Sequence, residues 1–117
     1  MAIRDENGYS KTTISIGVWD MNADSSKAVA HGLSSVEWKT IREISTIIRN
    51  DVESYYHDLE RVTVATGVSG GSVDTFDATN IVLVRHTGGT FDGVLFDDTS
   101  ALAEDTRGWV TFEYIAD

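Results

Sequence analysis

The chain has 117 residues, with a hydrophobic fraction of 41% and a charged fraction of 24%, values typical of one folded globular domain. Asp and Glu outnumber Lys and Arg by 19 to 9, and the net charge of −10 argues against nucleic acid and anionic membrane surfaces as partners. Cysteine is absent, which excludes disulfides, thiolate metal sites and a cysteine nucleophile.

Residues 1–12 are polar and contain a glycine, and they are predicted to form a mobile N-terminal segment. This segment lacks the apolar stretch and cleavage site of a signal peptide, and no later apolar run is long enough for a transmembrane segment. Neither export nor membrane insertion is therefore expected. Residues 13–117 contain no repeat, linker or shift in composition, and they are predicted to fold as a single domain.

The first predicted strand spans residues 13–20, where an aliphatic side chain occupies every second position from Ile14 to Val18. Residues 27–31 form the second predicted strand. The turn-like residues 21–26 lie between the two, so the pair is predicted to form a β-hairpin.

The next segment carries signals for both a helix and a strand. Ser34 and Glu37 have the spacing of a helical capping box, and isoleucines recur at helical intervals beyond them. The many β-branched residues of segment 40–48 favour a strand instead. We predict a short helix or turn near residues 35–38 and then a strand to about residue 50. An amphipathic helix over residues 40–48 is the alternative, and it would make the fold α+β.

Further strands are predicted over residues 54–59, 61–65, 81–86 and 108–115. Adjacent glycines at Gly70 and Gly71 predict a turn with positive φ angles, and residues 97–107 are predicted to be a loop. The spacing of these strands indicates an all-β fold, an antiparallel β-sandwich of about six to seven strands. The segments 67–76 and 88–98 are expected to be loops presented outward.

The residues that could carry chemistry lack the spacing of a known site. His31, His57 and His86 lie on separate predicted strands without metal-ligand spacing, and we interpret them as structural hydrogen-bonding residues. The string GVSGG at residues 67–71 departs from the nucleophile elbow and is more typical of a turn. No catalytic residue, metal site or cofactor is expected, so the chain is predicted not to be an enzyme.

Acidic residues in or near the predicted loops could in principle bind calcium: Asp74, Asp77, Asp92, Asp97 and Asp98. They do not match the EF-hand pattern, and we interpret them as solvated carboxylates. A glycan hydrolase is the enzymatic alternative. Its paired carboxylates would have to lie about 5 to 10 Å apart, a distance that a sequence does not supply.

The aromatic residues suggest a binding surface. Tyr55 and Tyr56 are adjacent, so in a strand their side chains face opposite sides. One of them, together with Trp19 or Trp109, could form a platform on which a sugar ring stacks. We therefore take Tyr55, Tyr56 and Trp109 as candidate residues for binding a glycan or a partner, while packing in the core or in an interface is the simpler alternative.

Four stretches of the chain together resemble small structural proteins of bacteriophage particles: IGVWDMNADSSKAVAHGL from Ile16, IRNDVESYYHDL from Ile48, TNIVLVRHTGGTFD from Thr79 and RGWVTFEYIAD from Arg107. The four stretches are spread over nearly the whole chain after Lys11. The resemblance implies a virion-associated protein, such as a head or tail fibre, spike or capsid decoration protein. It also implies a β-sandwich similar to that of H-type lectin domains.

The resemblance carries expectations about function. It implies a homotrimer located on the phage particle, acting by assembly and surface attachment with other virion proteins as partners. The alternative function is a carbohydrate-binding module that recognises cell-surface or mucin glycans.

Overall fold

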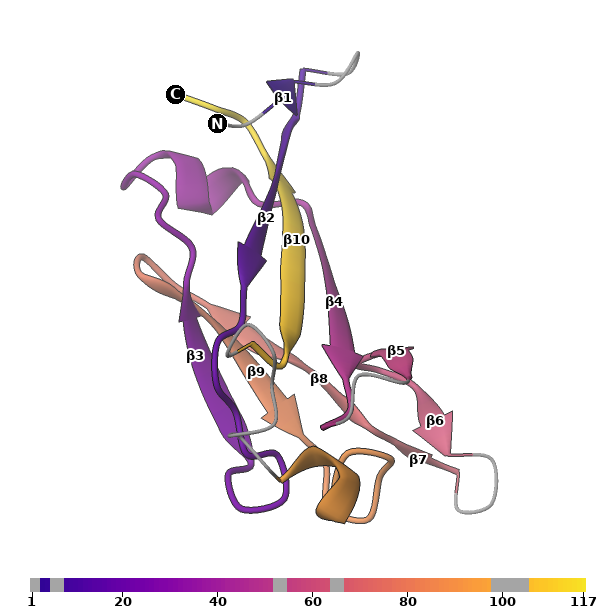
Figure 1. Ribbon diagram of the computed structural model, residues 1–117. Helices are drawn as coiled ribbons and strands as arrows, with labels where there is room; N and C mark the ends of the chain where they lie inside the picture. The colour runs from indigo at the N-terminus through magenta and orange to yellow at the C-terminus, as the bar shows by residue number, and fades with distance from the viewer. Residues whose placement is uncertain (1–2, 5–7, 52–54, 64–66, 98–105) are drawn as a thin grey trace.

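A computed structural model describes residues 3–4, 8–51, 55–63, 67–97 and 106–117. These residues form short strands and two single-turn 3₁₀ helices (Figure 1). In chain order the elements are β1 (Ile3–Arg4), β2 (Ser10–Ser15), β3 (Ser26–Ala30), η1 (Glu37–Thr40), β4 (Glu43–Arg49), β5 (Tyr56–Asp58), β6 (Val62–Thr63), β7 (Val68–Ser69), β8 (Gly71–Phe76), β9 (Asn80–Arg85), η2 (Val94–Phe96) and β10 (Gly108–Tyr114).

The strands build two antiparallel sheets that face each other, so the all-β sandwich predicted from the sequence is confirmed. One sheet has the order β1-β2-β10-β4-β5, and the other has the order β3-β9-β8. Strands β6 and β7 form a small ribbon of their own. The C-terminal strand β10 lies between β2 and β4, so residues from both ends of the chain meet in the centre of the larger sheet (Figure 1).

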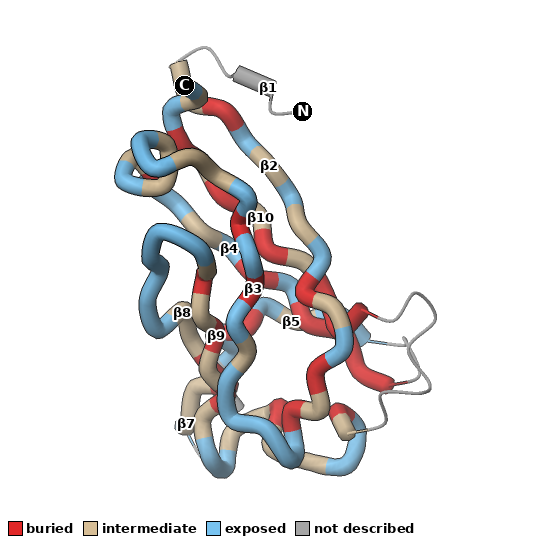
Figure 2. Tube along the Cα trace, turned by 90° about the vertical axis from the view of Figure 1, so that its left-hand side faces the viewer, coloured by how far each residue is buried: buried red, intermediate tan, exposed pale blue. Residues whose placement is uncertain are grey.

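The hydrophobic core lies between the sheets because the strands alternate inward and outward. In β10, Val110, Phe112 and Tyr114 are buried, while Trp109 and Glu113 are partly exposed on the outer face. Buried positions recur along the strands of both sheets, and exposed positions lie between them and in the turns (Figure 2). Other core side chains come from both sheets and their connections: Ile16, Trp19, Met21, Val29, Ile41, Ile48, Leu59, Ile81, Leu83, Phe91 and Phe96.

The segment with conflicting signals is a strand, as predicted, and a short helix precedes it. The backbone N–H of Ser34 donates to Glu37 Oε1 at 3.0 Å, and the N–H of Glu37 donates to Ser34 Oγ at 3.1 Å. This reciprocal pair has the hydrogen-bond pattern of a capping box, as the spacing suggested, and it closes the turn that leads into η1. The helix η1 ends after one turn, and β4 then pairs with β10 from Glu43 to Ile48.

The predicted hairpin is wrong, because β2 and β3 belong to different sheets. Strand β2 pairs with β1 and β10, whereas β3 pairs with β9. Strand β2 also ends at Ser15, and it begins at Ser10, inside the segment 1–12 that was predicted to be mobile. After β2 the chain passes from one sheet to the other. Gly17 has a φ of 82° in this connection, and Trp19 and Met21 in it are buried.

The segment 67–76 is not the outward loop that was predicted, because it holds β7 and β8. Gly67 has a positive φ of 70°, but Gly70 and Gly71 do not have the predicted positive values. A side chain at Gly71 would instead overlap the carbonyl oxygen of Val84 on β9. The adjacent glycines are therefore needed where other backbone segments pass close to them, and they do not form a turn with positive φ angles.

Other predicted segments match in part. Strands β3, β9 and β10 agree with their predicted positions to within about one residue, as is normal for strand ends. Position 54, positions 64–65 and most of the predicted loop 97–107 lie outside the described residues. The segment 88–98 contains η2, and its Phe91 and Phe96 are buried and not presented outward.

Candidate functional site

The adjacent tyrosines lie on opposite sides of the larger sheet, as the strand period requires. Tyr56 is on the outer face, where its ring lies 6.3 Å from that of Trp109 at an angle of 15°. Tyr55 is on the other side with His57, with ring centroids 6.3 Å apart and an angle of 22°. The three candidate binding residues are thus divided between two surfaces, with Tyr55 alone on one of them.

The outer pair is supported by a buried arginine. The guanidinium carbon of Arg49 lies 5.7 Å from the centre of the Trp109 ring, and Arg49 Nε donates to the carbonyl of Thr106 at 2.8 Å. Trp19 does not contribute to either surface, because it is buried and its indole N–H donates to the Asp24 carbonyl at 2.9 Å. The alternative platform with Trp19 is therefore wrong.

Tyr55 borders an open hollow of about 350 Å³, which we name the Tyr55 cleft. Its lining comes from the turn before β5, from β5 itself, from the turn into β6 and from the segment around η2: Asn50, Tyr55, His57, Arg61, Thr90, Leu95 and Phe96. The volume lies in the range of about 300 to 1,000 Å³ that small-molecule sites occupy. The cleft combines aromatic surface with a few polar groups, which is the usual composition of such sites.

Buried aromatic rings pack against His57 in the lining of the cleft. His57 lies 5.9 Å from Phe91 and 6.4 Å from Phe96, measured between ring centroids. Phe91 and Phe96 meet edge to face with ring centroids 5.0 Å apart, an arrangement that aromatic pairs prefer. Because both phenylalanines are buried, the imidazole rests on a packed surface.

The polar groups of the cleft are held in defined orientations. Arg61 Nη1 lies 3.0 Å from His57 Nδ1, and a guanidinium can only donate, so Nδ1 accepts and the imidazole proton is on Nε2. Burial, and then the positive charge of Arg61, lower the pKa of His57 below its usual value. Both effects keep the imidazole neutral.

The backbone near Tyr55 is fixed by hydrogen bonds. Asn50 Oδ1 accepts from the Tyr55 N–H at 3.2 Å, and the Asn50 N–H donates to the Tyr55 carbonyl at 3.2 Å. The Asp51 N–H donates to the Leu95 carbonyl at 2.8 Å, which brings η2 against this turn. Separate parts of the chain are therefore joined at the cleft.

Arg107 stabilises this end of the molecule from within. It is fully buried, and its guanidinium donates to the carbonyls of Trp19, Arg49 and Phe96 at 2.9 to 3.1 Å. Its Nη1 also lies 2.9 Å from Asp51 Oδ1. Sequence reasoning missed Arg107, which was assigned to a loop, since a single arginine before a strand gives no sign of burial.

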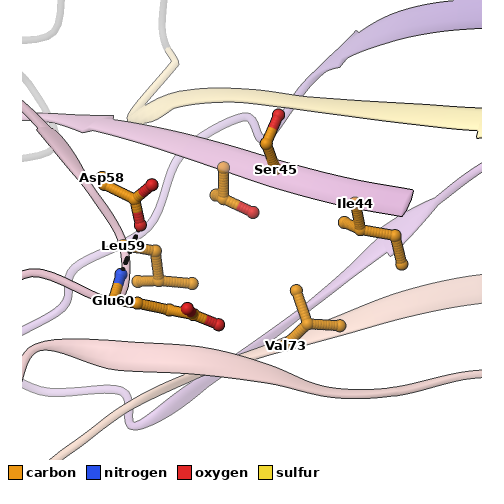
Figure 3. Close-up of a pocket in the computed structure, with 7 residues that line it drawn as sticks. Ile44, Ser45, Asp58, Leu59, Glu60 and Val73 are labelled. Atoms are coloured by element: carbon orange, nitrogen blue, oxygen red, sulfur yellow. Dashed lines mark hydrogen bonds between the residues drawn. The ribbon is translucent and has the colours of Figure 1, made fainter.

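A smaller hollow of about 70 Å³ lies on the other side of the β5–β6 turn (Figure 3). Asp58 and Glu60 lie along one side of it, and Ile44 and Val73 lie opposite (Figure 3). Asp58 Oδ1 accepts from the backbone N–H of Glu60 at 2.8 Å. The carboxylates of this segment therefore face the smaller hollow, whereas His57 and Arg61 line the Tyr55 cleft.

The remaining histidines are structural, as interpreted from the sequence. His31 Nδ1 accepts from the Leu33 N–H at 3.0 Å, so its Nε2 donates to the Asp77 carbonyl at 2.7 Å. His86 Nε2 is 3.3 Å from Ser72 Oγ. Within the described ranges, no cluster of three or more His, Asp or Glu side chains is arranged to hold a metal ion.

Several candidate calcium ligands have other roles. Asp77 Oδ1 accepts from the N–H groups of Thr79 and Asn80 in the turn before β9. Asp92 Oδ2 accepts from the Gly88 N–H at 2.8 Å, and its Oδ1 lies 3.6 Å from Arg85 Nη1. Asp98 lies outside the described residues.

No protein-family model matches this chain, and comparison with curated proteins and with solved structures gave no significant match. No helix in the described part of the chain has the length and apolar character needed to cross a membrane.

Proposed function

We propose that this chain is a non-enzymatic binding protein that holds a sugar ring of a glycan in the Tyr55 cleft. The observation that carries this proposal is an aromatic side chain that is 63% exposed beside a cleft of suitable size. Tyrosine combines a flat apolar ring with a hydroxyl group, so it can stack on the apolar face of a sugar while bonding its hydroxyls. The phenylalanines below the cleft supply rigidity that limits the entropic cost of binding.

Adjacent tyrosines offer a matched pair of variants for the test. Tyr55→Ala removes the ring that borders the cleft, whereas Tyr56→Ala removes a ring of similar exposure, 54%, on the opposite face. We expect wild type and Tyr56→Ala to bind the same members of a broad glycan panel, and Tyr55→Ala to lose at least about tenfold in affinity. Absence of binding by the wild type across the panel, or equal losses in both variants, would overturn the proposal.

We also propose that the protein acts as a homotrimeric adhesion or structural component of a phage particle. The four stretches that resemble phage virion proteins support this second proposal. A further support is that β3 and β8 are edge strands of the smaller sheet, and edges of this kind can be covered by subunit contacts. Light scattering on the purified protein should give the mass of a trimer, and antibodies to the chain should label purified particles. A stable monomer would contradict the trimer, and unlabelled particles would contradict the virion location.

A further inference from the structure

The Tyr55 cleft presents a positive charge on an acidic molecule. The chain carries a net charge of −10, yet among the described residues the lining of the cleft includes Arg61 and neither Asp nor Glu. The carboxylates that precede Arg61 in the chain, on Asp58 and Glu60, line the separate smaller hollow (Figure 3). A cationic group is therefore presented in a cleft whose described lining residues carry no carboxylate.

Arg61 is not used by the fold in the way that the buried arginines are. Arg85 and Arg107 form ion pairs with Asp92 and Asp51 and donate to backbone carbonyls. In the described part of the chain, no carboxylate lies within ion-pair distance of Arg61, and its guanidinium donates only to His57.

The contact with His57 sets the direction of the Arg61 guanidinium. One terminal nitrogen, Nη1, is held at 3.0 Å by the imidazole, which itself rests on Phe91 and Phe96. The other guanidinium nitrogens make no hydrogen bond to a described residue, so they can donate to a ligand. Two parallel N–H donors match the geometry of a carboxylate, and such charge-assisted pairs are among the stronger hydrogen bonds.

We propose that the Tyr55 cleft selects acidic sugars, with the sugar carboxylate paired to Arg61 and the sugar ring against Tyr55. This inference rests on the proposed glycan-binding function and names its ligand class. Tyr55 and Arg61 both line the same cleft, so a single monosaccharide unit of an oligosaccharide can contact both. The ligand is a uronic acid or another sugar that carries a carboxylate.

The test compares two oligosaccharides that differ only in the acidic group. Isothermal titration calorimetry would measure binding of an oligogalacturonide and of the corresponding neutral galactose oligomer to the wild type. We expect at least about tenfold tighter binding of the acidic oligomer, because its carboxylate can form a charge-assisted pair with the Arg61 guanidinium. We also expect this preference to weaken as salt is added.

Variants then assign the preference to Arg61. Arg61→Gln should bind both oligomers with equal affinity, because it removes the cation and keeps a polar side chain. Arg42→Gln makes the same change of net charge at an exposed position just before β4, outside the cleft lining, and should keep the preference. Circular dichroism and the melting temperature would verify that both variants fold. If Arg61→Gln is misfolded, Arg61→Lys replaces it, and we expect a reduced but measurable preference because the charge stays while the paired donors are lost.

The outcomes separate the two proposals. Equal binding of both oligomers by the wild type, with a loss in Tyr55→Ala, would overturn the acidic selectivity and leave the glycan-binding function standing. A preference that survives in Arg61→Gln would overturn the role of Arg61. A sulfated galactose oligomer that binds as tightly as the oligogalacturonide would overturn the specificity for carboxylates. Absence of binding to any of these sugars would overturn both proposals.

Discussion

Arg107 and Asp51 form a buried ion pair with a distance of 2.9 Å between Nη1 and Oδ1, next to the turn that carries Tyr55. The remaining donors of Arg107 satisfy backbone carbonyls from three separate segments. The Arg107 side chain therefore links segments at this end of the sandwich that are not joined by strand pairing through it.

The first prediction concerns this pair. Arg107→Met should lower the free energy of unfolding by about 3 to 5 kcal/mol, because Asp51 and several buried carbonyls lose their partner. Urea denaturation would measure the loss. Combining Arg107→Met with Asp51→Asn should cost less than the sum of the two single changes, since the uncompensated charge is then removed. If Arg107→Met lowers the free energy of unfolding by less than about 1 kcal/mol, the carbonyls that Arg107 binds must find other hydrogen-bond donors, and the prediction is wrong.

The second prediction concerns pH. Burial and the charge of Arg61 lower the pKa of His57 in the folded protein, so the unfolded chain binds more protons as the pH falls below about 6.5. This contribution to the free energy of unfolding is fully present above the unfolded pKa and is lost as the pH falls toward the folded pKa. Urea denaturation between pH 7.5 and 5 should show it. His57→Gln, which keeps an acceptor for Arg61, should have a smaller slope in this range, and an unchanged slope would contradict the prediction.

The third prediction concerns close packing of the backbone. Gly71→Ala should destabilise the fold by about 1 to 3 kcal/mol, because the new methyl group overlaps the Val84 carbonyl and forces β8 away from β9. Gly93→Ala is the matched control, since an added side chain there meets no atom and the φ of −174° suits any residue. Thermal unfolding of both variants would compare them. Equal melting temperatures would mean that β8 can shift without loss of pairing.

The fourth prediction concerns the cap of η1. Hydrogen bonds from the N–H groups of Asp117 and Ser34 lower the pKa of Glu37, so the stability that it contributes is present at neutral pH and lost in acid. Ser34→Ala should cost about 0.5 to 2 kcal/mol. Glu37→Gln, which keeps the acceptor but not the charge, should reduce the loss of stability below about pH 4.5. Both effects are measurable by chemical denaturation, and an equal acid slope in Glu37→Gln and wild type would contradict the assignment.

The parts of the fold that could be predicted are those that local patterns determine. Strand β10 was found because large apolar side chains alternate along it, and the capping box was found because its partners are only three residues apart. Strand β8 was missed since Gly70, Gly71 and the polar residues after them have the composition of a turn. The wrong hairpin has a different cause, because strand partners depend on contacts between distant residues that a local pattern does not contain.

The candidate site was predicted in part for the same reasons. The division of Tyr55 and Tyr56 between two faces follows from the strand period and was predictable. The cleft was not, since it needs Phe96 and Leu95 to come from a segment about 40 residues away in the chain. The sequence did not mark Arg61 as a candidate binding residue. Its proposed role depends on the orientation of the neighbouring carboxylates, which a sequence pattern does not show.

Around the turn after β5, His57 and Arg61 line the Tyr55 cleft, while Asp58 and Glu60 line the smaller hollow. Charged side chains only a few residues apart in the chain are therefore divided between two hollows. A change in the length of this turn would change which of these charged side chains faces the cleft. In such a protein, insertions and deletions within one short turn could change ligand preference without any change to the sandwich that carries it.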